Sequence, residues 1–187
     1  LRRVVFASSY LIYDPVHYQF SAAKAVPVRL SEDKPIRPRN LTGMAKLSHE
    51  MELEFLSGFE DCRFSTLAVR IFRGYGRNSR DVISRWVREL LAGNPISVYR
   101  PEGIFDYIYA ADNAEGLLRL AADNQAKGAV NLGTGRSRRV ADVVDVLRQH
   151  FPDAVVNFEV SDIPFEASEA DTTRLRSLID WTPELSL

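Results

Sequence analysis

The sequence has a single cysteine, Cys62, among its 187 residues. One cysteine excludes an intramolecular disulfide framework and suits a reducing compartment, so we expect a cytoplasmic protein. No apolar run approaches the roughly 18 residues that a membrane-spanning helix needs, which argues against a membrane protein. The formal net charge is −1, so the chain lacks the basic field by which proteins attract nucleic acids.

The chain also lacks an initiating methionine, and we expect it to be a piece of a longer protein. Its basic and then apolar start resembles a signal peptide, but the apolar part is too short, and a core strand is the better interpretation. His17, His49 and His150 share no metal-ligand spacing, and His49-Glu50 lacks the second histidine of a zinc protease because position 53 is leucine. We therefore expect no metal site.

A complete glycine-rich nucleotide fingerprint is missing as well. Gly133-x-Gly135 and Gly74-x-Gly76 each follow a predicted strand, but Arg138 and Ser79 stand where the third glycine belongs. That glycine allows close packing of helix on strand, so both segments are predicted to be tight turns. No Gly-x-Ser-x-Gly elbow occurs, which removes support for a nucleophilic hydrolase.

Strands that alternate with helices are what the sequence does contain. This order predicts an α/β fold with a Rossmann-like, doubly wound and mostly parallel sheet. Residues 16–40 form a long connection, of a length that usually serves a function. The predicted strands are 3–7, 66–72, 96–99, 105–109, 129–132 and 154–160, the pair 96–99 and 105–109 flanking a turn. The predicted helices are 41–57, 112–123, 139–150 and 172–179, together with one that Asn78 or Ser79 caps and whose apolar stripe runs from Val82 to Leu91.

The residues with the clearest chemistry lie at the end of the first strand and on the first helix. Ser8 and Ser9 follow the strand, whereas Thr42 and Lys46 are one helical turn apart on one face. Side chains at the carboxyl ends of parallel strands bind polar ligands in open α/β sheets. The sequence therefore predicts a polar site formed by this strand end and helix.

Two arginine clusters are candidates for binding anions. Arg73, Arg77 and Arg80 flank the turn at Gly74 and Gly76, at the carboxyl end of a predicted strand, and favour a phosphate site. Arg136, Arg138 and Arg139 precede a helix, at the end that disfavours cations. For this second cluster a solvated turn is the main interpretation and an anion site the alternative.

The order of these motifs resembles the extended short-chain dehydrogenase/reductases, the NAD-dependent epimerase/dehydratase family that acts mostly on nucleoside-diphosphate sugars. Six segments carry the resemblance: Val4 to Ser9 with Tyr13, the approach from Ser31 through Pro38 to the helix of Lys46 and Glu50, Arg70-Ile71-Phe72 with Gly76, Gly103 to Asp112, Asn131 to Gly135, and Asp171 through Trp181 to Pro183. The resemblance implies that residues 1–76 with 105–135 are the C-terminal half of a Rossmann-like NAD(P)-binding domain. It assigns 77–104 and 136–187 to a substrate-binding lobe.

The resemblance also implies roles for individual residues and partners. Ser9 and Lys46 are expected to be catalytic, with Thr42 at the position of the family tyrosine. Ser8, Lys46 and Phe72 are expected to contact NAD or NADP. The residues expected to contact a nucleotide-sugar or related small molecule are Ser9, Tyr10, Arg73, Arg77, Arg80 and Asp106. The family's N-terminal half, with its glycine-rich cofactor turn, is expected from the same gene or a partner; otherwise the uncovered sheet edge is expected to drive formation of a homo-oligomer.

Three departures from the family pattern limit the expected activity. A threonine hydroxyl at position 42 lacks the acidity of a tyrosine and is a poor general base. Arg73 replaces an asparagine and Phe105 an arginine, at positions that commonly contact the phosphates. Dehydratases carry an acid where this chain has Tyr10 and Leu11, so an epimerase- or reductase-like protein fits better.

Three functions remain open from the sequence. The first is an oxidoreductase or epimerase that uses Ser9, Lys46 and a substitute acid among Tyr10, Tyr13 and Tyr18. The second is a degenerate, non-catalytic relative that binds a ligand or a protein. The third is a binding module for a small phosphate-containing molecule that uses Arg73, Arg77 and Arg80.

Overall fold

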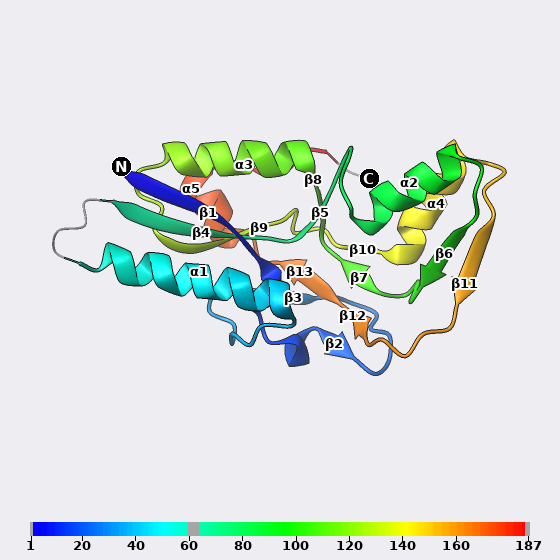
Figure 1. Cartoon of the computed structure of the whole chain (residues 1–187), viewed down its shortest axis with the longest axis horizontal. Coiled ribbons are helices and arrows are strands. Elements are labelled where there is room, and N and C mark those ends of the chain that lie inside the picture. Colours follow the sequence, from blue (N-terminus) through cyan, green and yellow to red (C-terminus); the bar gives the residue numbers. More distant parts are fainter. Residues whose placement is uncertain (1, 60–63, 186–187) are drawn as a thin grey trace.

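A three-stranded parallel sheet lies at the centre of the molecule (Figure 1). In the computed structural model, which describes residues 2–59 and 64–185, its strands are β1 (Arg3–Ser9), β4 (Ser65–Ile71) and β9 (Gly128–Leu132), in the order β1-β4-β9. Helix α1 (Leu41–Ser57) covers one face, and α3 (Ala110–Ala122) and α5 (Thr173–Ile179) lie on the other. The predicted α/β class with a mostly parallel sheet is confirmed. Cys62 lies outside the described residues.

Helix caps explain where the first two helices begin. Asn40 caps α1 by accepting a hydrogen bond from the Gly43 amide at 2.9 Å. Helix α2 (Val82–Leu91) begins later than expected, because its cap is Asp81, which accepts from the Ser84 amide at 3.0 Å. The prediction of Asn78 or Ser79 as this cap is therefore wrong. Asn78 instead takes a positive φ of 65° in the preceding turn.

Within residues 2–59 and 64–185 the buried hydrophobic side chains form three clusters: a sheet core, a lobe core and a further cluster of Tyr10, Tyr13, Tyr18, Leu30, Phe72 and Ala170. The sheet core contains Leu67, Val69 and Val130, with Leu175 of α5 and Trp181 packed against them. This packing places the last helix on the sheet, although 136–187 was expected in the smaller lobe. The lobe core is formed by α2, by α4 (Val140–His150) and by the short strands beside them; its buried residues are Ile83, Trp86, Leu90, Ile96, Val98, Tyr107, Val140, Val143, Val144 and Leu147.

The short strands pair over long distances in the sequence. β6 (Ile96–Tyr99) pairs in parallel with β11 (Val156–Glu159). β7 (Ile104–Phe105) pairs with β10 (Arg138–Arg139), and β8 (Tyr107–Tyr109) pairs with β5 (Arg73–Tyr75). The strands predicted at 96–99 and 105–109 do flank a turn, but the second is divided into β7 and β8, and β6, β7 and β8 each pair with a different strand.

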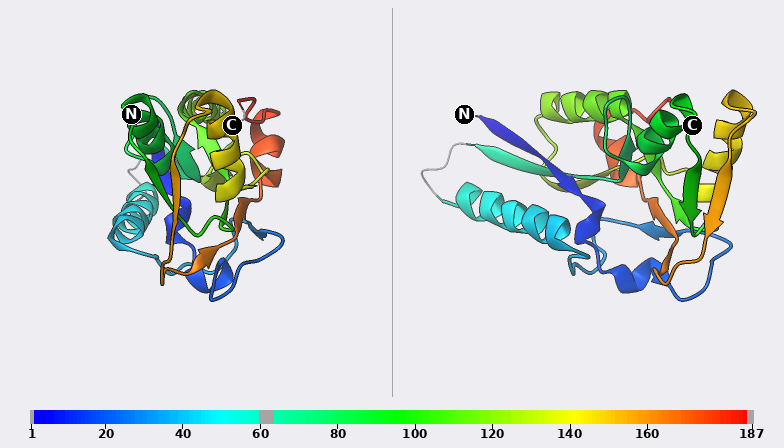
Figure 2. Two further views of the ribbon diagram at one scale, coloured as in Figure 1. Left: turned by 90° about the vertical axis from the view of Figure 1, so that its right-hand side faces the viewer. Right: turned by 45° about the vertical axis from the view of Figure 1, so that its right-hand side comes forward.

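The long connection at 16–40 is attached to the C-terminal part of the chain. The short helix η1 (Tyr10–Ile12) precedes it, and η2 (Pro15–His17) leads into it. β2 (Gln19–Phe20) then pairs with β12 (Phe165–Glu166), and β3 (Val28–Leu30) pairs with β13 (Ser168–Ala170). Figure 2 shows these blue and orange segments together beneath the sheet. Strand pairing therefore holds the connection against the C-terminal segment, beside the end of β1.

Strand β1 forms the edge of the central sheet. Over residues 2–59 and 64–185 it pairs only with β4, and the Arg2 carbonyl accepts from the Ser65 amide at 3.1 Å. Because backbone groups alternate in direction along a strand, those of Arg3, Val5 and Ala7 point to the open edge. Among the described helices, none combines the length and hydropathy that crossing a bilayer requires.

Candidate functional site

The two serines at the end of β1 have different surroundings. Ser8 is buried, and its hydroxyl donates to the Glu50 carboxylate of α1. Ser9 is half-buried and caps η1, where its Oγ accepts from the Leu11 amide at 3.2 Å. Ser9 thus keeps its own hydroxyl hydrogen available, whereas Ser8 has already donated its own.

Lys46 and Thr42 lie beside the same strand end. The Lys46 Nζ donates to the Ala7 carbonyl at 2.6 Å and lies 5.0 Å above the centre of the Phe6 ring. Thr42 is exposed on the first turn of α1. Next to it, the backbone of Gly43 lies against η1 so closely that a Cβ would stand 2.4 Å from the Leu11 carbonyl oxygen. The structure therefore brings the helix of Thr42 and Lys46 against the segment that follows Ser9.

A network of buried polar side chains lies next to this strand end. The Arg70 Nη2 lies 2.9 Å from the Glu50 carboxylate, and Nη1 donates to the Tyr13 hydroxyl at 3.2 Å. Tyr13 donates to the Asn131 side-chain oxygen at 2.6 Å. The Asn131 amide in turn donates to Glu32 at 2.8 Å. Together with the hydrogen bond from Ser8 to Glu50, these contacts join all three central strands to α1.

Sequence reasoning missed the structural role of this network. A signal was present, because Arg70 interrupts an otherwise apolar strand and Asn131 another. A buried charge or amide in a central strand requires a partner, so each residue pointed to a second polar group elsewhere in the chain. The identity of those partners could come only from the fold.

The tyrosines considered as substitute acids are buried. Burial and, to a smaller extent, the nearby Glu166 carboxylate raise the pKa of Tyr10 well above its ordinary value. Burial likewise raises the pKa of Tyr13 and of Tyr18 to about 12. A phenol with a raised pKa and no access to solvent is a poor proton carrier near neutral pH. The structure therefore gives no support to a tyrosine substitute for Thr42.

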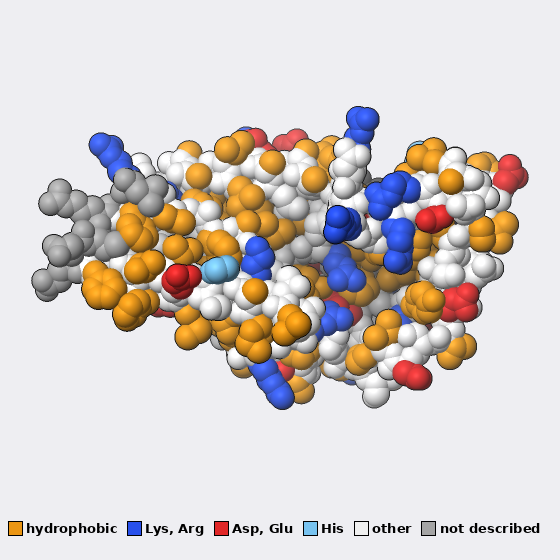
Figure 3. Space-filling model, in the orientation of Figure 1, with side chains coloured by type: hydrophobic (Ala, Val, Ile, Leu, Met, Phe, Trp, Pro, Cys, Tyr) orange, Lys and Arg blue, Asp and Glu red, His pale blue; other side chains and the backbone are white. Residues whose placement is uncertain are grey.

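A cavity of about 190 Å³ lies between the lobe and the segments that carry Arg39 and Glu166, and positively charged side chains gather in its lining. Four arginines and one carboxylate line it: Arg39, Arg73, Arg85, Arg100 and Glu166. Figure 3 shows lysine and arginine side chains gathered over this middle part of the molecule. The excess of cations makes the cavity suited to an anion.

Glu166 organises one side of this arginine-lined cavity. Its carboxylate is only 3% exposed and accepts from the Tyr10 hydroxyl and from the Ser168 hydroxyl, each at 2.8 Å. Its other oxygen forms an ion pair with Arg39. Arg39 was not expected at a site, since no sequence motif relates position 39 to position 166.

The three arginines expected to act together are separated. Arg73 lines the arginine-lined cavity, whereas Arg77 is exposed and lines a different cavity of about 400 Å³ beside α2. Arg80 is exposed in the turn before α2 and lines neither of these two. Only Arg73 therefore joins the cluster with Glu166.

Asp106, expected at the substrate, is completely buried at 0% exposure. Its carboxylate accepts from the Thr134 and Gly135 amides, from the Thr134 hydroxyl and from the Ala170 amide. Burial raises the pKa of Asp106, although these hydrogen bonds oppose the rise. The amides of the Gly133–Gly135 turn thus bind an internal carboxylate, and Asp106 organises the turn from a position that a ligand does not reach.

The residues expected to contact NAD(P) fit that role only in part. Ser8 donates to Glu50, and Phe72 is buried with its ring stacked 5.0 Å from that of Tyr10. Lys46 keeps spare N–H donors, since an ammonium has three and one is used. Of these three residues, Lys46 alone is free to hold a cofactor hydroxyl.

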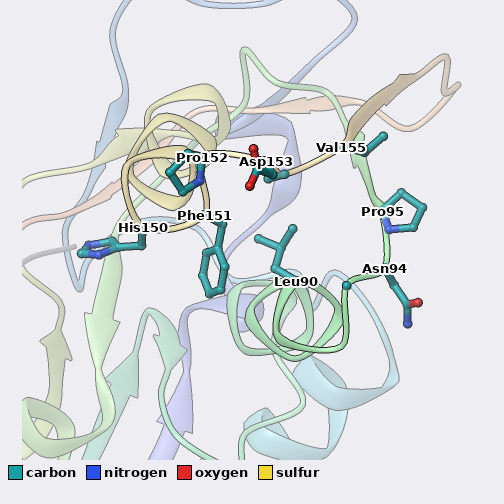
Figure 4. A pocket seen from close by; sticks show the side chains of 10 residues that line it. Leu90, Asn94, Pro95, His150, Phe151, Pro152, Asp153 and Val155 are labelled. Carbon is teal, nitrogen blue, oxygen red and sulfur yellow. The ribbon is translucent and has the colours of Figure 1, made fainter.

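Other parts of the described chain add little chemistry. Residues 2–59 and 64–185 contain no group of three or more histidine, cysteine, aspartate or glutamate side chains placed to hold a metal ion. A cavity of about 490 Å³ opens where α2 and α4 end, with Leu90, Phe151 and Asp153 in its lining (Figure 4). None of the residues expected at the site lines it.

Comparisons with known proteins agree with this geometry. The chain is 25% identical over 209 aligned positions to a UDP-glucose 4-epimerase of Dictyostelium discoideum, covering 97% of this chain and 57% of that protein. It is 27% identical to MoeE5, solved with UDP-glucose and NAD, with a TM-score of 0.82 over 100% of this chain and 61% of the other. The UDP-glucose 4-epimerase of Thermotoga maritima, 22% identical with a TM-score of 0.80 over 100% of this chain and 60% of that one, shows the same fold.

The chain spans about three fifths of the length of these relatives. Within that span the sequence profile of the NAD dependent epimerase/dehydratase family matches residues 1–133. The match contains the β1 serines, the α1 lysine and Arg73. The protein therefore belongs to the NAD dependent epimerase/dehydratase family.

Proposed function

We propose that this chain is the substrate-binding part of an epimerase/dehydratase-family protein that acts on a nucleoside-diphosphate sugar. The observation that carries the proposal is the arginine-lined cavity, where four arginines face one glutamate. A nucleoside diphosphate supplies the anionic groups that such a cluster binds. MoeE5, the relative solved with a bound UDP-sugar, supports this ligand class.

Within the family, the chain resembles epimerases and reductases more than dehydratases. An elimination needs an acid beside the active-site serine, and the residues there are Tyr10 and Leu11. Tyr10 is buried and its hydroxyl is given to Glu166 at 2.8 Å. Neither residue can exchange a proton with a sugar, which disfavours an elimination and leaves a reaction limited to hydride transfer, with NAD(P) held mainly by the rest of the family fold.

Turnover is proposed to be impaired. Ser9 and Lys46 lie at the expected strand end, but Thr42 supplies no phenol, and Tyr10, Tyr13 and Tyr18 are buried. A second candidate function, a non-catalytic relative that binds a nucleotide sugar, is favoured by the same observation. The two differ in whether bound substrate is ever converted.

The open edge of β1 supports a proposed partner. Backbone groups of Arg3 and Val5 face away from β4, whereas the Ala7 carbonyl on the same side accepts from Lys46, and α1 exposes large apolar side chains such as Met51 and Phe55. Such surfaces associate with another strand or helix. We propose that the remainder of the family fold, in the same polypeptide or a partner, covers this edge; a homo-oligomer is the alternative.

Calorimetric titration with UDP, UDP-glucose and NADH tests the proposed function. We expect UDP and UDP-glucose to bind and Arg77→Ala, outside the arginine-lined cavity, to bind them like the parent chain. Conversion of UDP-glucose by the chain joined to the rest of the fold separates the enzyme from the non-catalytic relative. Absence of UDP binding at millimolar concentration would overturn the proposal.

A further inference from the structure

The lobe ends in a strand whose outer edge is open. β11 pairs in parallel with β6, and within residues 2–59 and 64–185 it pairs with no other strand. In Figure 1 β11 lies at the right-hand margin of the molecule, with β6 on its inner side, whereas β1 starts at the opposite end. The open edges of β11 and β1 are therefore separate surfaces.

The hydrogen bonds to β6 show which backbone groups of β11 are free. The Val155 carbonyl accepts from the Ile96 amide at 3.0 Å, so the backbone of Val155 faces β6. Because backbone groups alternate in direction along a strand, the backbone of Asn157 faces the same way. The N–H and C=O groups of Val156 and Phe158 therefore point to the open edge.

The edge of β11 carries few of the features that keep strand edges apart. Such edges are commonly protected by proline, lysine or an outward charge. Residues 154–160 contain neither proline nor lysine, and their one charged side chain, Glu159, accepts from the Ser97 hydroxyl of β6 at 3.4 Å. The large apolar side chains exposed along this segment are Val155 at 60%, Phe158 at 54% and Val160 at 97%. An apolar edge of this kind is suited to pairing with another strand.

Two copies of β11 fit each other in one antiparallel register. A twofold axis at Asn157 pairs Val156 of each copy with Phe158 of the other, which satisfies the free N–H and C=O groups of both residues in both copies. A register centred on Val156 would need Ala154, whose amide is already used in a turn. A register centred on Phe158 would need Val160, which lies beyond the end of β11.

The side chains agree with this register. Glu159 lies opposite Val155 of the other copy, so the two carboxylates stay roughly 14 Å apart along the strands and do not face each other. Phe158 lies beside Val156 of the other copy. Pairs of an aromatic and a β-branched side chain stabilise antiparallel strands. The edge is therefore complementary to itself in both charge and shape.

The cavity where α2 and α4 end lies beside the same edge (Figure 4). Ala154 and Val155 line it together with Leu90 and Phe151. In the register centred on Asn157, Val160 of the second copy continues opposite Ala154. The most exposed valine of the segment thus reaches the apolar lining of the cavity. A second copy accounts for the open strand, the exposed valine and the cavity together.

We infer that β11 is an interface between two copies of this chain, which join their lobes into one continuous antiparallel extension of the β6–β11 sheet with its twofold axis at Asn157. The inference does not depend on the proposed function, and its surface is distinct from the open edge of β1. Asn157 occupies a position without hydrogen bonds between the copies, where Cβ atoms are about 4.5–5.5 Å apart. The two Asn157 side chains therefore lie next to each other on one face of the sheet.

Disulfide formation tests the register. In a Cys62→Ser background, Asn157→Cys should oxidise with diamide to a covalent dimer at least about tenfold faster than Glu159→Cys, because a disulfide joins Cβ atoms up to about 4.5 Å apart and only the two copies of position 157 approach that distance. Glu159→Cys is the matched control, since both positions are exposed on the same face of β11. Equal rates, or no covalent dimer from Asn157→Cys, would overturn the interface.

Sedimentation analysis of the full chain tests the association itself. The parent should dimerise, and Phe158→Lys, which places a charge on the edge, should raise the dissociation constant of the dimer at least about tenfold. Val16→Lys places the same charge at an exposed valine of η2 and should leave the constant within about twofold. Thermal unfolding checks that both variants fold as the parent does.

The same measurement can contradict the inference in two ways. A Phe158→Lys variant that dimerises as tightly as the parent would overturn it and move the interface to another surface, such as the edge of β1. A parent chain that stays monomeric at about 100 μM would overturn it in favour of a strand from a different protein. Binding of UDP is unaffected by either result, so the proposed function is judged separately.

Discussion

The strand end at Ser9 and the arginine-lined cavity differ in how their polar groups are used. At the strand end, Ser8 donates to Glu50 and Lys46 donates to the Ala7 carbonyl. In the cavity, the Arg73 guanidinium lies over the Phe105 ring and beside the Tyr10 hydroxyl, and within residues 2–59 and 64–185 it forms no ion pair with a carboxylate. The first region satisfies most of its polar groups internally, whereas the second leaves charge available to a ligand.

The chain therefore has one region suited to binding an anion and another, the strand end, where proton transfer would have to occur. A site ready to bind needs donors without protein acceptors, and the arginine-lined cavity has them. A site ready for proton transfer needs a group with a pKa near the working pH. The strand end has no such tyrosine, because Thr42 occupies the relevant position and the nearby phenols are buried.

Removal of Glu50 should have the largest effect on stability, because it takes away the carboxylate that Ser8 and Arg70 share at the strand end. Glu50→Ala leaves the Arg70 charge buried without its partner, which should lower the free energy of unfolding by about 3–5 kcal/mol. Urea unfolding measures the change. Glu52→Ala is the matched control on the same helix, because its pair with His49 is exposed and should contribute less than about 1 kcal/mol. Equal effects of the two substitutions would show that the buried network does not stabilise the fold.

Restoring a phenol should sharpen the difference in chemistry. In the chain joined to the rest of the family fold, Thr42→Tyr should raise the rate of UDP-glucose conversion about 100-fold or more, since a general acid or base contributes roughly that factor. Thr42→Phe supplies the ring without the hydroxyl and should leave the rate unchanged. If the tyrosine and phenylalanine variants have the same rate, the defect lies elsewhere than at position 42.

The cap of α2 predicts a pH dependence in the lobe. Burial raises the pKa of Asp81, but hydrogen bonds from Ser84 and Ser79 outweigh it and hold the pKa below its ordinary value. The stability that this carboxylate contributes is therefore present above the unfolded-state pKa of about 3.9 and is lost as the pH falls through the lowered folded-state value. Asp81→Ala should cost about 1 kcal/mol at pH 7.

Asp81→Asn separates the cap from its charge. Asparagine caps a helix equally well without titrating, so unfolding of this variant should change less with acid than that of the parent. Urea titrations at pH 7, 5 and 3 compare the two proteins. An identical loss of stability in both on acidification would assign the pH dependence to other carboxylates.

The smallest expected effect concerns Arg80, and it sharpens the contrast among the arginines. Arg80 is exposed and lines neither the arginine-lined cavity nor the cavity beside α2. Arg80→Ala should change UDP affinity by less than about twofold, because an exposed charge outside a site contributes little. Calorimetry with UDP checks this, and a loss of about tenfold or more would move the site toward the turn before α2.

Local sequence signals predicted the main elements well. The helix predicted at 41–57 coincides with α1, and the strand predicted at 66–72 coincides with β4 to within one residue at each end. Such features act within a few residues, so a single sequence contains them. The same limit explains the missed cap, since Asn78, Ser79 and Asp81 are all good capping residues and only the turn geometry selects Asp81.

Contacts between distant segments could not be read from the sequence. Tyr10 and Glu166 are 156 positions apart, and Arg70 and Glu50 are 20 positions apart on different elements. The pairing of β2 with β12 also depends on how the whole chain closes. The functional roles of Ser9, Lys46 and Arg73 stay predictions. The structure adds the hydrogen-bond partners and ring contacts that limit which role each side chain can have.

Gly43 sets how closely α1 can approach the segment after Ser9. Even one methyl group there would collide with the Leu11 carbonyl, whose oxygen would be 2.4 Å away. The helix would have to withdraw, and its first two turns would carry position 42 and the lysine away from the strand as one rigid piece. An attempt to restore proton transfer by a substitution at position 42 therefore depends on Gly43, a residue without a side chain. Substitutions at position 42 will be informative only while position 43 remains glycine.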